Sequence, residues 1–169
     1  MTDQLLDQAL VEEATKKSAL IWVRGDGPVR ALWHVWHEGA AYIVGDGPDE
    51  QPLPRLSAGA TAEVTVRSKD KGGRLIVWTA TVEELAPHSE EWEAAVAELK
   101  GKRLNAQDAE RIPERWAREC RVLRLAPGHA TRELPDGSLA AVPLPTGATT
   151  REQAPAGLPR LLFKRKKKR

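Results

Sequence analysis

Four basic side chains stand close together in a short polar stretch, at Arg67, Lys69, Lys71 and Arg74. Cationic N–H groups bind phosphate oxygens by charge and by hydrogen bonds, so this cluster suits a phosphorylated ligand. Turns are commonly polar without binding anything. A phosphate site and a solvated, charged turn are therefore the two interpretations that these residues leave open.

Two β-patterned runs flank the basic stretch. Residues 62–67 alternate apolar and polar side chains, and residues 75–82 are rich in β-branched and aromatic types. Gly72 and Gly73 supply the turn chemistry between them. The pattern predicts a long β-hairpin over residues 61–85 with the basic cluster at its tip.

The rest of the chain predicts a small β-barrel with helices outside it. A helix is expected over 3–17 with Leu6, Ala9, Leu10 and Ala14 on its buried stripe. Strands are expected over 18–23, 29–36, 41–44 and 120–125, and a Pro/Gly-rich loop over 45–54. Ser89 caps a helix over 89–100 that ends near Gly101, and Asn105 caps a further helical stretch to about residue 118.

Composition indicates one compact domain with tails. The chain has 169 residues, of which 41% are hydrophobic. We expect the barrel domain at 1–126, an extended Pro/Gly-rich arm at 127–163 and a disordered basic tip at 164–169. The net charge is +2, but without the six basic residues of the tip 20 bases face 24 acids, a net charge of −4. The basic balance therefore belongs to the tip and says little about the barrel.

Three features of the sequence bear on where the protein is located in the cell. No apolar run approaches the roughly 20 residues of a membrane span, and the first residues do not resemble a secretory signal. Cys120 is the only cysteine, so no disulfide framework forms within one chain. We expect a cytoplasmic protein.

Hydrolytic, metal and dinucleotide chemistry find little support. On a strand the side chains of His34 and His37 would point to opposite faces, which disfavours a shared metal ion. Ser68 and Ser89 lack a nucleophile-elbow context, and Cys120 is expected to be a small buried residue. The glycine clusters at 45–47 and 72–73 do not form a dinucleotide-binding motif.

Tryptophans dominate the aromatic residues. They stand at positions 22, 33, 36, 78, 92 and 116. A tryptophan usually serves packing in a core or an interface, because it buries a large area. Stacking on a cofactor ring is kept open for Trp33 and Trp78 alone, and a regular strand would place Trp33 and Trp36 on opposite faces.

The order of these elements, with the stretches 31–36, 67–69, 74–78 and 111–116, resembles the flavin-binding split β-barrel superfamily. This is the pyridoxamine 5'-phosphate oxidase-like and flavin/deazaflavin oxidoreductase group, and the likeness over about 5–126 is to a small actinobacterial branch. The resemblance implies a mainly β fold with α, six or so antiparallel strands and flanking helices. It also implies a homodimer that binds FMN, or alternatively a deazaflavin, in a cleft completed by the partner subunit.

The resemblance assigns roles to particular residues. The flavin ring would lie near Ile43, Val44 and Gly45, with Trp33 or Trp78 beside it. The phosphate would be held by Arg30, Arg67, Lys69 and Arg74, and Ser68 is a further cofactor-binding residue. Gln51 and Arg55, in the loop, are weaker candidates.

One departure from the family pattern lies in the loop after the third strand. Many FMN-binding members have a Lys or Arg there, whereas this chain has Asp46, Asp49 and Glu50. Like charges disfavour a phosphate nearby. Three outcomes stay open: the hairpin alone holds the phosphate, the cleft binds something else, or the cofactor is absent.

Two functions of different classes follow. The first is an FMN- or deazaflavin-dependent oxidoreductase acting on an unknown small molecule. The second is a non-redox binding or scaffold protein, whose basic tip contacts nucleic acid or an anionic membrane without sequence specificity.

Overall fold

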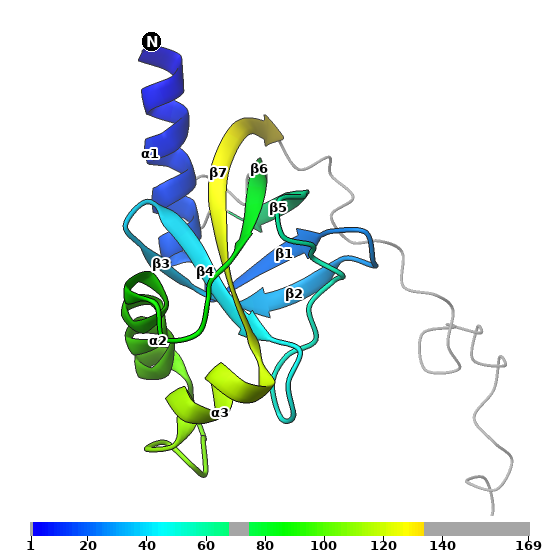
Figure 1. Cartoon of the computed structure of the whole chain (residues 1–169). Coiled ribbons are helices and arrows are strands. Elements are labelled where there is room, and N and C mark those ends of the chain that lie inside the picture. Colours follow the sequence, from blue (N-terminus) through cyan, green and yellow to red (C-terminus); the bar gives the residue numbers. More distant parts are fainter. Residues whose placement is uncertain (1, 68–74, 134–169) are drawn as a thin grey trace, which may run out of the picture. The chain divides into compact units, whose positions relative to one another are not determined.

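The computed structural model describes residues 2–67 and 75–133. All of them belong to one compact unit, Met1–Pro135. This part of the chain forms three helices, α1 (Thr2–Lys17), α2 (Glu90–Lys102) and α3 (Ile112–Glu119) (Figure 1). It also forms seven strands: β1 (Leu20–Arg24), β2 (Arg30–Trp33), β3 (Val35–His37), β4 (Ala40–Gly45), β5 (Thr61–Arg67), β6 (Leu75–Glu84) and β7 (Arg121–Glu133).

The strands form one antiparallel sheet that curls into a nearly closed barrel. Its order is β2-β1-β5-β6-β7-β4-β3. The two outermost strands, β2 and β3, are consecutive in the chain and separated only by His34. One bent segment, predicted as a single strand over 29–36, therefore supplies both edges of the sheet. Such closure protects edges that would otherwise be unpaired.

The barrel interior is filled by alternate residues of the strands. Ile21 and Val23 of β1 are buried, whereas Leu20 and Trp22, which alternate with them, are exposed. The buried set includes Val64, Ile76, Trp78, Leu123 and Leu125. This two-residue period is what a half-buried strand requires, and it confirms the β pattern read from the sequence.

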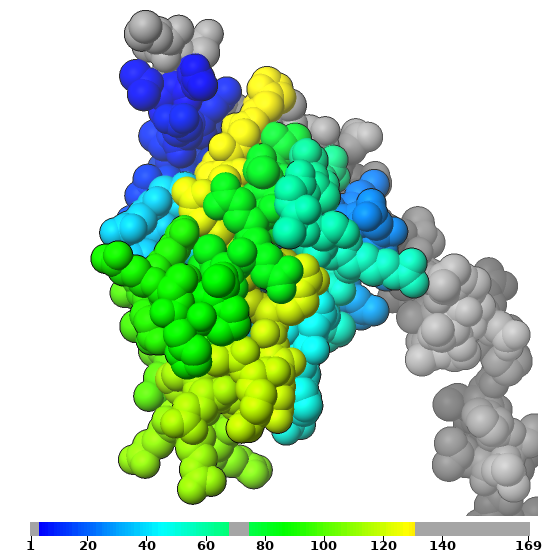
Figure 2. Space-filling model, in the orientation of Figure 1, coloured from blue at the N-terminus to red at the C-terminus, as the bar shows by residue number. Residues whose placement is uncertain are grey.

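A second apolar cluster lies outside the barrel, beneath α2 and α3. Trp92 and Leu99 of α2 and Trp116 of α3 are fully buried there. Strand β4 separates the two clusters, because Ile43 belongs to the barrel interior and Val44 to the helix layer. All six residues of β4 are therefore buried. In Figure 2 the surfaces of α2 and α3, green to yellow-green, lie at the lower left, beside the surfaces of the strands.

Helix α1 confirms the predicted span but corrects the predicted buried stripe. Val11 and Ala14 are buried, whereas Leu6 is 55% exposed and Ala9 is exposed as well. Only the last turns of α1 pack on the barrel, and its first turns extend beyond the strands (Figure 1). Periodicity alone reveals an apolar stripe, but not where along the helix its neighbour ends.

The ends of the other elements confirm some capping predictions and correct others. Ser89 caps α2 by accepting a hydrogen bond from the Trp92 amide at 3.2 Å. Asn105 caps no helix; it has a φ of +58°, and α3 begins only at Ile112, with Pro113 in its first turn. Strand β7 continues to Glu133, beyond the predicted end at 125, because residues 126–133 pair with β6.

None of the helices among the described residues is long and apolar enough to cross a membrane.

Candidate functional site

One face of the sheet, on strands β2, β1 and β5, carries exposed apolar side chains. We call the outer sheet face the surface made by Leu20, Trp22, Ala31, Trp33, Thr65 and Arg67. Cross-strand pairing places Leu20 opposite Trp33, and Trp22 opposite both Ala31 and Thr65. Trp22 is 42% exposed and Leu20 is 40% exposed. Large apolar side chains that line up at exposed positions mark a surface for a ligand or a partner.

Arg67 is the last residue of β5 and is exposed on the same face as Thr65. It is the one member of the predicted phosphate cluster that the structure describes on the hairpin. Ser68, Lys69 and Arg74 lie outside the described residues. Arg30 is exposed at the start of β2, opposite Val23 of β1. Arg55, in the loop, is exposed with a φ of +49°.

Trp33 stands where the outer sheet face meets the helix layer. Its ring packs on that of Trp116, with centroids 6.4 Å apart and planes tilted by 40°. The side chain is half-buried, so one part contacts the helix layer and the rest is accessible. The structure therefore leaves Trp33 able to flank a ligand on the outer sheet face.

The remaining predicted ring contacts are enclosed within this chain. Trp78 has no exposed surface, and its ring meets that of Trp36 edge-on at 6.4 Å. Ile43 and Val44 are also fully buried. A ligand ring could approach these side chains only if neighbouring groups moved, so the accessible part of the predicted site is Trp33.

The space beside Gly45 is filled by the chain itself. A Cβ on Gly45 would collide with the Gln51 carbonyl oxygen and with Leu53, whose Cδ2 would lie 2.8 Å away. The loop 45–54 thus folds back over the end of β4. The close approach explains why glycine stands at this position.

Gln51 serves this loop as a structural clamp. Its Oε1 accepts a hydrogen bond from the Trp33 amide at 2.9 Å. Its Nε2 donates to the carbonyl oxygens of Trp33 at 3.0 Å and of Val44 at 3.1 Å. One side chain therefore satisfies backbone groups on two strands that do not pair with each other there.

The acidic residues of the loop are largely compensated by neighbouring cations. Glu50 has a side chain only 1% exposed, and its carboxylate pairs with Arg103 and Arg115 at 3.3 Å each. Asp46 accepts from the Leu53 amide at 2.8 Å and pairs with Arg121 at 3.4 Å. The sequence argument against a phosphate treated these charges as free, and for Glu50 and Asp46 that premise is wrong.

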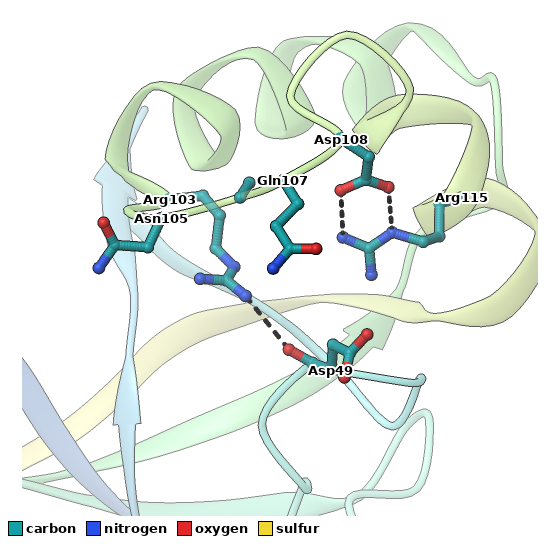
Figure 3. Close-up of a pocket in the computed structure, with 7 residues that line it drawn as sticks. Asp49, Arg103, Asn105, Gln107, Asp108 and Arg115 are labelled. Carbon is teal, nitrogen blue, oxygen red and sulfur yellow. Dashed lines mark hydrogen bonds and ion pairs between the residues drawn. The ribbon is translucent and has the colours of Figure 1, made fainter.

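A polar pocket of about 400 Å³ opens between this loop and the connection from α2 to α3. Figure 3 shows Arg115 facing Asp108, with the Gln107 side chain between Arg103 and Arg115. Arg115 donates to both Asp108 oxygens, at 2.8 and 3.3 Å. This hydrogen bond holds the pKa of Asp108 below its usual range. The two guanidinium groups are thus paired with carboxylates, Arg115 with Asp108 and Glu50, and Arg103 with Glu50.

Two other side chains that could be reactive, Cys120 and His34, are made unreactive by burial. Burial, with Glu50 nearby, raises the pKa of the Cys120 thiol to about 11, so the thiolate is scarce at neutral pH. His34 is fully buried, and burial lowers its pKa to about 4. His37, in contrast, is half-buried and lies against the Tyr42 ring.

Sequence reasoning missed the outer sheet face as a unit. Trp22 was expected to serve packing in a core or an interface, and Leu20 was assigned no role. The sequence does contain a sign of this face: Leu20 and Trp22 are apolar residues at positions of a strand that usually face water and carry polar side chains. Glu50 gave no such signal, since its partners lie 53 and 65 residues further along the chain.

The search for relatives by sequence gives no match. No family model matches the chain, and no curated protein matches it.

Solved structures, in contrast, match most of the chain. HutZ, the heme storage protein from Vibrio cholerae, is 12% identical, with a TM-score of 0.53 over 74% of this chain and 93% of that one. A NimC/NimA family protein from Clostridium acetobutylicum is 19% identical, with a TM-score of 0.51 over 78% and 88%. A conserved hypothetical protein from Mycobacterium tuberculosis is 11% identical, with a TM-score of 0.53 over 79% and 92%. At these identities the likeness shows the fold alone: this chain has the split β-barrel fold that its sequence resemblance predicted.

Proposed function

We propose that this protein is a cytoplasmic, homodimeric oxidoreductase that binds FMN, or a deazaflavin in its place, and acts on a small molecule. The outer sheet face carries the proposal. It presents exposed aromatic and aliphatic side chains, Trp22 and Leu20, beside half-buried Trp33, and it ends at the cation Arg67. A planar aromatic ring with a phosphate requires this combination of an apolar platform and a charge at its edge.

The described residues fit such a cofactor on this face. Trp33 and Trp22 would flank the ring, and Arg67 would contact the phosphate together with Lys69, Arg74 and Ser68 of the hairpin tip. The bound cofactor would supply the hydride chemistry. The chain's own residues would orient it and hold its charge, with no protein acid or base required. HutZ, which has a similar fold, is a heme storage protein, so heme is included as a competing ligand in the test below.

A second copy of the chain would complete the site. Trp22 and Leu20 have exposed fractions of 42% and 40% in the single chain. Covering them removes apolar surface from water, which stabilises an assembly by roughly 25 cal/mol per Å² before the costs of association. A partner subunit on the outer sheet face would also exclude water from a ring bound there.

Cofactor analysis of the freshly purified protein tests the proposal. Its absorbance spectrum is recorded, and whatever heat releases is identified by mass spectrometry. The protein is then titrated with FMN, a deazaflavin and heme. A flavin or deazaflavin, bound or taken up at one per chain, is the expected result. Uptake of heme alone, or of none of the three, would overturn it.

Paired variants test the phosphate assignment. Arg67→Ala with Lys69→Ala should abolish flavin retention and leave the dimer folded, because the phosphate loses two of its cations. Lys100→Ala with Arg118→Ala is the matched control, since it removes the same charge from exposed positions on α2 and α3. Stoichiometric cofactor in the first double variant would contradict the assignment.

A non-redox scaffold is the second candidate. The burial of Ile43, Val44 and Trp78 favours it, because these are side chains that the resemblance places against the ring. In this case deletion of residues 164–169 would abolish salt-sensitive binding to nucleic acid or anionic vesicles. For the oxidoreductase the same deletion leaves flavin binding and turnover unchanged.

A further inference from the structure

Trp33 is contacted by Gln51 of the loop 45–54 and by Trp116 of α3, and Trp116 is itself bound by Glu50 of the same loop. Gln51 binds both backbone groups of Trp33, its N–H at 2.9 Å and its carbonyl oxygen at 3.0 Å. The preceding residue, Glu50, accepts a hydrogen bond from the Trp116 indole at 3.1 Å. Trp116 in turn packs against the Trp33 ring. Adjacent residues of the loop thus hold the backbone of Trp33 directly and its ring through Trp116.

From this geometry we infer that Gln51 and Glu50 are positioning residues that set the orientation of Trp33 on the outer sheet face. Gln51 fixes the position of the Trp33 backbone relative to β4, because the same side-chain amide also donates to the Val44 carbonyl oxygen at 3.1 Å. Its role differs from the phosphate contact that the sequence suggested. The inference rests on the proposed function only where it concerns a bound ring.

Glu50 is itself held in place from the opposite side. Its buried carboxylate pairs with Arg103 from the end of α2 and with Arg115 of α3. These two guanidinium groups border the polar pocket in Figure 3. Arg115 is also held by Asp108, and Arg103 by the Asp49 carbonyl oxygen at 3.2 Å. A carboxylate fixed by two cations orients its third partner, Trp116, better than a solvated one, since its own movement is restricted.

Fluorine NMR of protein labelled with 5-fluorotryptophan tests the inference without any cofactor. The Trp33 resonance is assigned by its loss in Trp33→Phe. Gln51→Met keeps the length of the side chain and removes all three hydrogen bonds, so the Trp33 resonance should shift or broaden. Asp46→Ala is the matched control: it loosens the same loop at Leu53 and Arg121 but has no contact with Trp33 among the described residues.

Titration with FMN adds a second readout through a double-mutant cycle. Gln51→Met should weaken FMN binding roughly tenfold in the wild-type background and not at all in the Trp33→Ala background, which has no ring for Gln51 to position. A role confined to stability would weaken binding equally in both. Glu50→Gln, which keeps an acceptor for Trp116 and loses the charge, should give a smaller shift of the Trp33 resonance.

The outcomes separate this inference from the proposed function. If the wild-type protein binds neither FMN nor a deazaflavin, the function fails while the fluorine spectra still decide the positioning role. An unchanged Trp33 resonance in Gln51→Met, or an equal change in Asp46→Ala, would overturn the inference. If Gln51→Met does not fold, Gln51→Glu replaces it, because a carboxylate still accepts from the Trp33 amide but cannot donate to the two carbonyl groups.

Discussion

His34 connects the end of the first helix to the bend that closes the barrel. Its Nε2 lies 2.8 Å from the Thr15 carbonyl oxygen, in the last turn of α1. A carbonyl oxygen only accepts, so Nε2 carries the proton and the neutral ring donates to the helix end, where the Thr15 carbonyl oxygen also accepts from the Ser18 amide at 3.3 Å. Burial lowers the pKa of His34 to about 4, well below its ordinary value of 6.5. The packing between α1 and the bend therefore favours a neutral His34 side chain.

The lowered pKa predicts a loss of stability in acid. Below pH 6.5 the unfolded chain takes up a proton at His34 that the folded chain resists down to about pH 4. Stability should therefore fall as the pH drops through this window, by about 3 kcal/mol in total from this residue. Urea unfolding at pH 7 and at pH 4.5 measures it. His34→Gln retains a donor for Thr15 and should lose this part of the pH dependence. An equal difference in unfolding free energy between pH 7 and pH 4.5 in both proteins would contradict the assignment.

Cys120 predicts slow thiol chemistry in the folded protein. Burial raises its pKa to about 11 from 9, which lowers the thiolate fraction at pH 8 about a hundredfold. Iodoacetamide should modify the native protein correspondingly more slowly than the urea-unfolded protein, as mass spectrometry can follow. Modification at comparable rates in the two states would show that the thiol is accessible and ionised.

The loop 45–54 is the element that joins the barrel to the helix layer. It reaches β2 through Gln51, β7 through Asp46, and the helices through Glu50. None of these contacts is local, and those of Gln51 and Glu50 satisfy polar groups that are largely buried. The loop therefore acts as a structural part of the domain despite its three prolines.

Glycine substitutions at two positions test how tightly this loop is packed. Gly45→Ala should destabilise the protein by about 1–3 kcal/mol, because the new methyl group meets the Gln51 carbonyl oxygen and Leu53. Gly101→Ala in α2 meets nothing within 4 Å and should instead stabilise by roughly 0.5–1 kcal/mol through helix propensity. Urea unfolding of both variants checks the pair, and an unaffected Gly45→Ala would show that the loop yields.

Removal of the buried carboxylate tests the same element electrostatically. Glu50→Ala leaves Arg103 and Arg115 without their shared partner and should cost about 3 kcal/mol, the lower end for a broken buried pair, since both guanidinium groups keep some exposure. Asp49→Asn, at an exposed neighbouring position whose φ of +62° asparagine also tolerates, is the control and should stay within about 0.5 kcal/mol of wild type. Equal unfolding midpoints for the two variants would contradict the ion-pair role.

The barrel domain, over the residues that the structure describes, has two unlike sides. The helices α2 and α3 bury one side of the barrel, over β4, whereas the outer sheet face keeps Trp22 and Leu20 exposed. We expect a second copy to cover that face in solution. The barrel would then bury apolar surface on both sides, as a sheet with two apolar faces requires.

Trp22→Lys tests the assembly. A cation at the centre of a covered apolar face should raise the dimer dissociation constant about a hundredfold, the range of an interface hot spot. Leu104→Lys is the control, because Leu104 is 75% exposed in the connection from α2 to α3, outside the outer sheet face. Size-exclusion chromatography with light scattering measures the mass. A Trp22→Lys protein that remains dimeric while wild type is dimeric would place the interface elsewhere.

Local patterns in the sequence determined most of the elements. Two-residue alternation predicted the strand before the hairpin tip, β-branched and aromatic residues predicted the strand after it, and Ser89 marked the start of α2. Proline and glycine marked the loop 45–54. These features depend on residues within one turn or one strand, so the sequence carries them without knowledge of the fold. The Arg67, Lys69 and Arg74 cluster was recognisable in the same way, although only Arg67 is described by the structure.

Tertiary structure decided the rest, because it depends on which distant residues meet. The strand over 29–36 is interrupted at His34 because its two halves pair with different strands, β2 with β1 and β3 with β4. The first half of the apolar stripe of α1 stays exposed because the barrel does not extend that far along the helix. Trp78 and Ile43 became interior residues because the sheet closes around them. Glu50 changed from an apparent obstacle to a phosphate into an anchor once Arg103 and Arg115 reached it. A sequence states the charge of a side chain, whereas only the folded chain determines the partner that neutralises it.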